Sequence, residues 1–237
     1  MIAVTGATGR LGRLVVRDLL DRGIAPSEIV AAVRSPEKAS DLAERGVEVR
    51  EADYTRPDTL DSAFRDVDRL LLISSNEVGR RVAQHRNVVD AAKKAGIGFL
   101  AYTSIVHADK SPIQLAAGHK ATEELIRASG LPFAFLRNSW YIENYTENLD
   151  QALERGVLIG SAGEGRVSGA TRADYAAAAA AVLTGEGHEG AVYELGGDEA
   201  FTMAELAAEI TRQSGVEVVY RDLPVEAWDR EERRLLA

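Results

Sequence analysis

The hydrophobic positions of this chain follow two alternating patterns, and the alternation predicts its fold. Short unbroken apolar runs, such as Ile2–Thr5 and Ile29–Val33, are typical of parallel strands covered on both faces. Between them, apolar residues recur with a helical period, as Leu11, Val15 and Leu19 do. The N-terminal part of the chain is therefore expected to alternate strand and helix.

The same alternation continues to residue 137. Further strands are predicted at 47–50, 69–73, 99–103 and 133–136, and further helices at 36–45, 57–65, 78–95 and 115–128. Strands and helices that alternate over short links predict a parallel sheet between two layers of helices. We therefore predict a doubly wound α/β domain over residues 1–137.

A glycine turn joins the first strand to the first helix. Gly6, Gly9 and Gly12 follow one another at a spacing of three residues. In this context the first glycine permits a sharp turn, the second lets the backbone approach a pyrophosphate, and the third lets the helix pack on the strand. The N–H groups at the helix N-terminus attract phosphate. The pattern predicts an NAD(P)-binding Rossmann fold, and the alternative is an ordinary tight turn.

The pattern changes after residue 137, where elements are shorter and less regular. Helices are predicted at 148–155, 172–183 and 203–213, strands at 157–159, 192–195 and 216–220, and a mobile glycine-rich loop at 160–169. We predict that residues 138–237 form a smaller C-terminal α/β lobe that covers the cofactor crevice. This lobe is expected to be interleaved with the first domain rather than independent.

The residue that follows the second strand bears on the choice of cofactor. In folds that prefer NAD, an acidic residue about twenty positions after the glycine turn binds the ribose 2′-hydroxyl. Here the position holds Arg34, with Lys38 one helical turn later. A guanidinium binds a 2′-phosphate through paired charge-assisted hydrogen bonds, whereas a carboxylate would repel it. We therefore predict NADPH; the alternative is that Arg34 stacks on the adenine or points to solvent.

Composition and charge limit the cellular location and the binding partners that we expect for this chain. The net charge of −9 argues against a nucleic-acid surface. The chain has no cysteine, so disulfides and thiol chemistry are excluded. The longest apolar run, Tyr175–Leu183, is too short to span a bilayer. We expect a soluble cytoplasmic protein with neither a nucleic-acid nor a membrane partner.

The motifs that are missing limit the chemistry. None of the 7 tyrosines is followed by a lysine four positions later, the pair that serves most short-chain dehydrogenases as proton donor. The scattered histidines and the absence of HExxH and GxSxG give no support to a metal site or a hydrolase. Two possibilities remain. One is a reductase whose substrate needs hydride but no strong acid, such as a quinone; the other is a non-catalytic NADP-binding redox sensor that reports to a partner protein.

Six stretches between residue 1 and about residue 220 carry a resemblance to a known family. They are GATGRLG (6–12), LLLISSNEVGRR (70–81), QHRNVVDAAKKAG (84–96), AYTSIVHAD (101–109), LRNSWYIENY (136–145) and ATRADYAAAAAAVL (170–183). The chain resembles the NmrA-like branch of the atypical short-chain dehydrogenases/reductases, and within it the bacterial NAD(P)H:quinone oxidoreductases of type 2. The resemblance implies an NADPH-dependent oxidoreductase with a quinone as its small-molecule substrate.

The resemblance also implies which residues hold NADPH. They are Gly6, Ala7, Thr8, Gly9, Arg10, Leu11, Arg34, Ser74, Ser75, Asn76, Asn138, Ser139, Trp140, Tyr141, Ile142, Glu143 and Arg172. Asn138 is expected to fix the nicotinamide carboxamide. Trp140 and Tyr141 are expected to wall a planar quinone site, unless both pack within the lobe. Arg172 is expected to reach the cofactor phosphates, unless it forms a surface ion pair.

No catalytic acid is assigned by the sequence. Relatives that reduce phenolic alkenes and ethers carry a lysine on the helix after the fifth strand, and His119 falls nearest that place, beside Lys120. His119 is therefore a weak candidate for a proton donor. The favoured alternative is a structural histidine, and His107 is a weaker rival. Members of this family usually continue beyond the equivalent of Ala237, so either this protein lacks that tail or this sequence omits it, and the expectation for the substrate pocket depends on this more than that for the cofactor cradle does.

Overall fold

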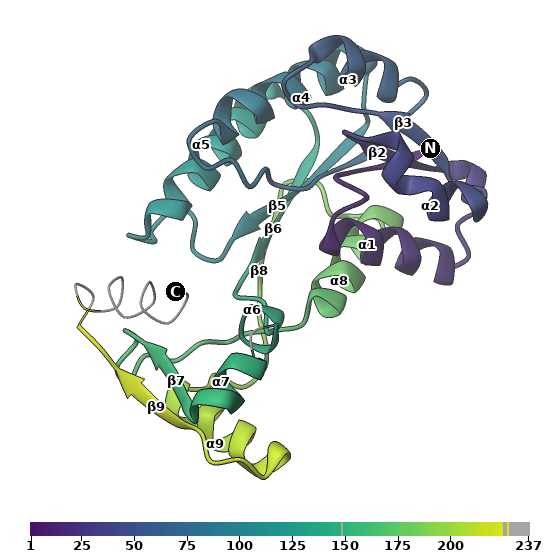
Figure 1. The fold of residues 1–237 in the computed structure, drawn as a ribbon. Coiled ribbons are helices and arrows are strands. Elements are labelled where there is room, and N and C mark those ends of the chain that lie inside the picture. The colour runs from purple at the N-terminus through teal and green to yellow at the C-terminus, as the bar shows by residue number, and fades with distance from the viewer. Residues whose placement is uncertain (148, 225–226, 228–237) are drawn as a thin grey trace. The chain divides into compact units, whose positions relative to one another are not determined.

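A computed structural model describes residues 1–147, 149–224 and 227, and it separates into two compact units. The first unit holds Met1–Asn138 and Arg172–Leu195, and the second holds Ser139–Thr171 and Gly196–Ala237. In the first unit, helices cover both faces of one parallel sheet (Figure 1). This arrangement confirms the predicted doubly wound α/β fold.

The sheet of the first unit has the strand order β3-β2-β1-β4-β5-β6-β8, and its neighbouring strands all pair in parallel. The strands are β1 (Ile2–Thr5), β2 (Ile29–Val33), β3 (Glu48–Glu51), β4 (Arg69–Leu72), β5 (Phe99–Ile105), β6 (Phe133–Asn138) and β8 (Ala191–Leu195). The order reverses between β1 and β4. In such sheets a crevice opens at this point, beyond the carboxyl ends of the strands, and ligands bind there.

The helices of the first unit lie where the sequence predicted them, although several of their ends differ by a few residues. They are α1 (Arg10–Asp21), α2 (Ser40–Glu44), α3 (Pro57–Ala63), α4 (Arg81–Ala95), α5 (Gln114–Ser129) and α8 (Arg172–Thr184), with 3-10 turns at Pro26–Glu28 and Pro36–Ala39. The helix predicted from Val78 begins only at Arg81, because the preceding residues form tight turns in which Val78 N–H bonds to Asn76 O. The predicted helix at 36–45 is divided into a 3-10 turn and α2.

The core explains why the strands read as unbroken apolar runs. All five residues of β2 and all seven of β5 are buried, because helices cover both sheet faces. On one face, Leu70, Leu72, Leu100 and Phe135 join a single apolar cluster with residues of α3 and α4. Burial of each such side chain contributes about 1.5–3 kcal/mol, so this cluster is a substantial source of the stability of the first unit.

The segment Arg172–Leu195 corrects the domain boundary predicted from the sequence. The sequence placed it in the lobe at 138–237, but the structure places it in the first unit. β8 pairs with β6 from Ala134 to Asn138 and so extends the sheet at its edge. The alanine-rich helix α8 packs against α1, where Arg22 Nη2 donates to Ala177 O over 3.2 Å. The small side chains of α8 permit this close packing. The periodicity of the sequence does not show which element α8 packs against.

The second unit has its own small core. Its elements are α6 (Glu143–Thr146), α7 (Leu149–Arg155), β7 (Val157–Gly160), α9 (Met203–Ser214) and β9 (Val219–Asp222), and β7 pairs with β9 in parallel. Ala152, Ala207, Ile210 and Val218 pack together between them. The strand predicted at 216–220 begins later, at Val219, and the short helix α6 was not predicted. Position 148, where the sequence predicted the start of the helix at 148–155, lies outside the described residues.

Candidate cofactor-binding site

The glycine turn has the geometry that its sequence predicted. Gly6 has a φ of +59°, which favours glycine, and Gly9 N–H donates to Gly6 O over 2.8 Å. A Cβ atom at Gly12 would lie 2.3 Å from Gly6 O and 2.8 Å from the Cα of Ala7, so no larger residue fits there without backbone movement. Helix α1 starts at Arg10 with no acidic residue in its first turn. The turn therefore leaves an electropositive helix end open to an anion.

A cavity of about 350 Å³ lies beside this turn, within the first unit. It is lined by Gly6, Thr8, Gly9, Arg34, Ser35, Lys38, Ala52, Asp53, Tyr54, Ile73, Ser74, Ser75, Asn76, Glu77 and Gln84. Seven of the residues predicted to bind the cofactor are thus gathered at one cavity. Ala7 and Leu11 are buried behind the turn and Arg10 is exposed, and none of these three lines the cavity.

The cationic end of the cavity is held in place by its neighbours. Arg34 is exposed at the end of β2, beside Asp53. Partial burial would raise the pKa of Asp53, but hydrogen bonds from Thr55 and the charge of Arg34 outweigh this effect and lower it. Arg13 on α1 donates to Thr8 O over 3.2 Å and to Lys38 O over 2.7 Å. Arg13 therefore ties the glycine turn to the segment that carries Lys38.

One helix fixes Ser75 through three side chains that the sequence analysis missed. On α4, His85 Nε2 accepts from Ser75 N–H over 2.9 Å, and Arg81 Nε donates to Ser75 O over 2.8 Å. Gln84 Oε1 accepts from the Ser75 hydroxyl. Arg81, Gln84 and His85 lie at positions i, i+3 and i+4, so they share one helix face. Polar residues with this spacing on the buried face of an amphipathic helix were the signal that could have revealed them.

A second set of buried hydroxyls holds the two residues before Ser75. Thr5 Oγ1 accepts from Ile73 N–H and Thr103 Oγ1 accepts from Ser74 N–H, each over 2.9 Å. The Tyr54 hydroxyl donates to Ile73 O over 2.9 Å. The backbone of the loop after β4 is therefore held by hydrogen bonds to side chains rather than by hydrogen bonds between strands. Such a loop is organised before any ligand arrives, which lowers the entropic cost of binding.

Asn138, the last residue of β6, presents an unusual polar group. Its side chain is buried, and its Oδ1 has no hydrogen-bond partner among the described residues. Its backbone oxygen accepts from Val106 N–H over 3.0 Å, which joins β6 to the turn after β5. A buried acceptor without a partner costs about 1–3 kcal/mol, so this position favours a ligand that donates a hydrogen bond.

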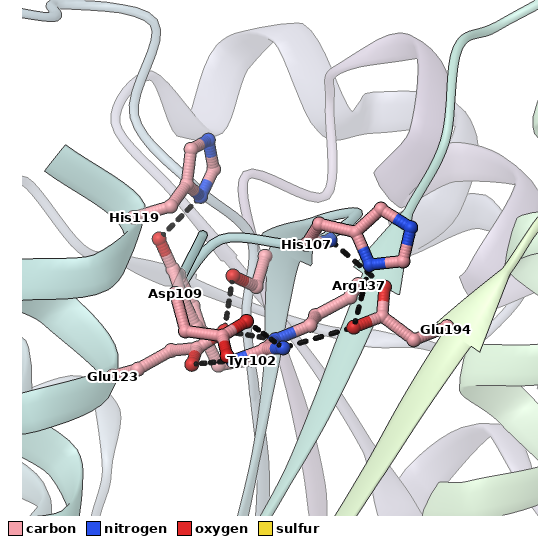
Figure 2. A network of polar contacts seen from close by, with 8 residues as sticks. Tyr102, His107, Asp109, His119, Glu123, Arg137 and Glu194 are labelled. Carbon is pink, nitrogen blue, oxygen red and sulfur yellow. Dashed lines mark hydrogen bonds and ion pairs between the residues drawn. The ribbon is translucent and has the colours of Figure 1, made fainter. Parts of the chain in front are cut away.

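His119 has the surroundings of a structural residue. It is buried, and its Nδ1 lies 2.8 Å from the Tyr102 hydroxyl (Figure 2). Burial, aided by the charge of Arg81, lowers the pKa of His119 to about 3. The imidazole is therefore neutral near pH 7, and a neutral imidazole is too weak an acid to serve as the proton donor. These contacts favour the structural alternative over the weak sequence candidate.

Beside Asn138, Arg137 joins four elements through carboxylates. Its Nε and Nη2 bind Glu123 on α5 over 2.9 and 2.7 Å, and its Nη1 donates to Asp109 over 2.6 Å and to Glu194 over 2.9 Å. Figure 2 shows the guanidinium between these three acids. Arg137 and Glu194 are direct neighbours across β6 and β8. The network fixes the carboxyl ends of β6 and β8 and the turn after β5.

The remaining predicted site residues stay predictions. Ser139, Trp140, Tyr141, Ile142 and Glu143 lie in the second unit, where Trp140 is 43% exposed. Arg172 is the first residue of α8 in the first unit and is half-buried.

The chain belongs to the NAD(P)H-binding family, whose model matches residues 6–186. The matched stretch includes the glycine turn and all the residues that line the cavity beside it.

Particular relatives narrow the comparison. The chain is 55% identical to quinone oxidoreductase 2 of Escherichia coli K12 over 94% of this chain and 78% of that protein. The crystal structure of the NADPH-dependent quinone oxidoreductase QOR2 of Escherichia coli with NADPH matches with a TM-score of 0.91 over the same shares of both chains. Triphenylmethane reductase from Citrobacter sp. is 43% identical and matches with a TM-score of 0.95 over 100% of this chain and 83% of that one. These matches confirm the resemblance inferred from the sequence motifs.

Proposed function

We propose that this protein uses NADPH to reduce quinones by direct hydride transfer, without a flavin. The observation that carries the proposal is the pair of complementary features in the first unit. A glycine cradle and the cations Arg34 and Lys38 suit a phosphorylated dinucleotide, and the buried Oδ1 of Asn138 suits a carboxamide N–H. These features match opposite ends of NADPH.

The residues of the cavity fit the cofactor by their chemistry. The backbone at Gly6 and Gly9 leaves room for a pyrophosphate at the start of α1. Arg34, with Lys38 beside it, binds a 2′-phosphate, which NADPH has and NADH lacks. Bound NADPH supplies hydride to a substrate. The protein contributes orientation, exclusion of water and a fixed electrostatic environment.

The substrate class is argued from chemistry and from relatives. A quinone gains an aromatic ring when it accepts hydride, so the step needs no strong acid and no second redox cofactor. This suits a chain in which no tyrosine is followed four residues later by lysine. Quinone is named for the relative that is 55% identical, and triphenylmethane dyes for the one that is 43% identical. Both are conjugated molecules that can accept hydride.

The proposal is tested with purified protein shown by its absorption spectrum to carry no flavin. Oxidation of NADPH is followed with benzoquinone, with menadione and without quinone. We expect turnover that depends on quinone and is faster with NADPH than with NADH. A need for added flavin would refute direct transfer. Tight NADPH binding without turnover would instead support the redox sensor. The cytoplasmic location expected from the sequence stays a prediction.

A further inference from the structure

We propose that His107 is the catalytic residue that supplies the proton to the reduced acceptor. The inference rests on the proposed function, because conversion of a quinone to a hydroquinone takes one hydride and one proton. The sequence ranked His107 below His119 as a donor. The structure reverses this order, since His119 is buried against Tyr102 while the His107 side chain is 68% exposed.

The backbone places His107 next to the residue proposed to bind the nicotinamide carboxamide. Ile105 at the end of β5 pairs with Asn138 at the end of β6, and Val106 N–H donates to Asn138 O over 3.0 Å. His107 is the next residue along the chain. It therefore lies at the carboxyl edge of the sheet, close to the reacting end of the proposed cofactor site.

The conformation of His107 is fixed from both sides. Its φ is +52°, a region that costs free energy for a residue with a side chain. Its N–H donates to Glu194 Oε2 over 2.9 Å, and its carbonyl oxygen accepts from Lys110 N–H and Ser111 N–H over 2.9 and 2.7 Å. Uncommon backbone conformations that are held by several contacts cluster at functional sites.

The imidazole is oriented by the same carboxylate. His107 Nδ1 lies 3.7 Å from Glu194 Oε1, and Figure 2 shows the other ring nitrogen, Nε2, pointing away from Glu194. Nε2 is thus left to face a ligand, and the exposed ring can take a new proton from water.

The charged groups around His107 come from three elements. Glu194 faces it from β8, Arg137 reaches Glu194 from β6, and Asp109 and Lys110 lie in its own turn. Arg137 Nη1 donates to both Glu194 and Asp109, so it locks the partner of His107 and the turn together (Figure 2). Glu194 and Arg137 are therefore positioning residues for the proposed acid.

The proposed step balances in atoms and charge. Bound NADPH would supply the hydride, whose hydrogen would end in the O–H bond at one quinone oxygen and whose two electrons would leave the other oxygen as a phenolate of the aromatic ring, with NADP⁺ as the oxidised cofactor. The Nε2–H bond of the His107 imidazolium breaks, and the proton forms the new O–H bond of the hydroquinone. The neutral imidazole then takes a proton from solvent. The sum is quinone, NADPH and one proton giving hydroquinone and NADP⁺.

The activity test uses His107→Gly with His188→Gln as control. Glycine adopts a positive φ without strain, so this variant keeps the turn. The control histidine lies before β8, at the other end of that strand, and its Nδ1 contacts Tyr193. We expect His107→Gly to lower kcat for quinone by roughly tenfold or more, with little change in KM for NADPH and with recovery on addition of imidazole. The control should retain the wild-type kcat.

A second readout needs no turnover. The complex with NADP⁺ is titrated with 4-nitrophenol, whose coloured anion imitates the phenolate product. The wild type should bind the anion about tenfold more tightly than His107→Gln, because a charge-assisted hydrogen bond is lost. Equal affinity of the wild type and His107→Gln for the anion, together with an unchanged kcat in His107→Gly, would overturn the inference while leaving quinone reduction intact. Absence of quinone turnover in the wild type would overturn both proposals.

Discussion

The imidazole of His85 accepts a hydrogen bond from the backbone N–H of Ser75 over 2.9 Å, which links a buried helix face to the wall of the cofactor cavity. Its other nitrogen, Nδ1, lies 3.0 Å from Thr122 Oγ1 on α5. The Thr122 hydroxyl donates to Gly118 O, so it accepts from Nδ1–H and leaves Nε2 as the acceptor. His85 must therefore be neutral to hold Ser75.

Replacement of His85 should weaken cofactor binding even though this side chain is buried. His85→Leu removes the acceptor of Ser75 N–H, and one hydrogen bond is worth about 1 kcal/mol, so Kd for NADPH should rise about fivefold. Fluorescence titration with NADPH measures this Kd, and His188→Leu is the matched control. Unchanged affinity in a folded His85→Leu protein would show that the loop after β4 needs no support from α4.

Stability should fall on mild acidification because of two buried histidines. Burial, together with the charge of Arg81, lowers the pKa of both His85 and His119 to about 3, whereas an unfolded histidine titrates near 6.5. Between these values the unfolded chain binds more protons than the folded one. Each histidine therefore lowers the free energy of unfolding by up to about 1.4 kcal/mol per pH unit as pH falls from about 6.5 towards 3.

Urea unfolding at about pH 7 and about pH 5 checks this sign. The wild type should lose more stability between the two values than His119→Gln, which keeps a partner for Tyr102 but cannot titrate there. A pH dependence that is the same in both proteins would contradict the buried neutral state of His119.

The glycine turn should tolerate no methyl group at its third position. In Gly12→Ala the new Cβ would meet the backbone at Gly6 and Ala7, so the free energy of unfolding should fall by about 1–3 kcal/mol despite the better helix propensity of alanine. NADPH binding should weaken as the turn opens. Gly79→Ala is the control, because its Cβ would have no atom within 4 Å. Equal urea midpoints for the two variants would count against the close approach of α1 to the turn.

Arg34 should decide between the two nicotinamide cofactors. Arg34→Ala removes the charge-assisted contacts with a 2′-phosphate, which are worth about 1.5–3 kcal/mol, so Kd for NADPH should rise by roughly tenfold or more. Kd for NADH should change little, since that molecule has no 2′-phosphate. Arg45→Ala, at the exposed C-terminus of α2 and outside the cavity, should alter neither value. An equal loss of both affinities in Arg34→Ala would assign Arg34 to the adenine instead.

The buried pair of Arg137 and Glu123 should depend on both charges being present. The two side chains are 8% and 5% exposed, so Arg137→Met leaves a buried carboxylate whose remaining hydrogen-bond partner among the described residues is the Ser104 hydroxyl. Removal of one partner of a buried pair typically costs about 3–5 kcal/mol. The double variant Arg137→Met/Glu123→Gln should recover part of this loss, because it removes the unpaired charge. Urea unfolding compares the single and the double variant. If the double variant recovers none of the lost free energy of unfolding, packing of the arginine side chain rather than its charge stabilises this part of β6.

Sequence patterns sufficed for features that depend on local geometry. A strand covered on both faces reads as an unbroken apolar run, as β2 does, and a turn that requires close backbone approach reads as glycine at Gly6 and Gly12. Arg34 was identifiable because its place is counted along the chain from that turn. The parallel sheet, the glycine cradle and the cationic end of the cavity were therefore predictable.

Tertiary structure decided which distant side chains meet and what charge they carry. Nothing in the local pattern shows that His85 supports Ser75 or that Arg137 gathers acids from three other segments. The exposure of His107 and the burial of His119, which reverse their order as proton donors, result from packing of α5 and from the turn after β5. The sequence by itself determined the fold and the glycine turn, because these follow from periodicity and backbone sterics. Long-range contacts, set only when the chain folds, determined the protonation states and the partners at the reacting end.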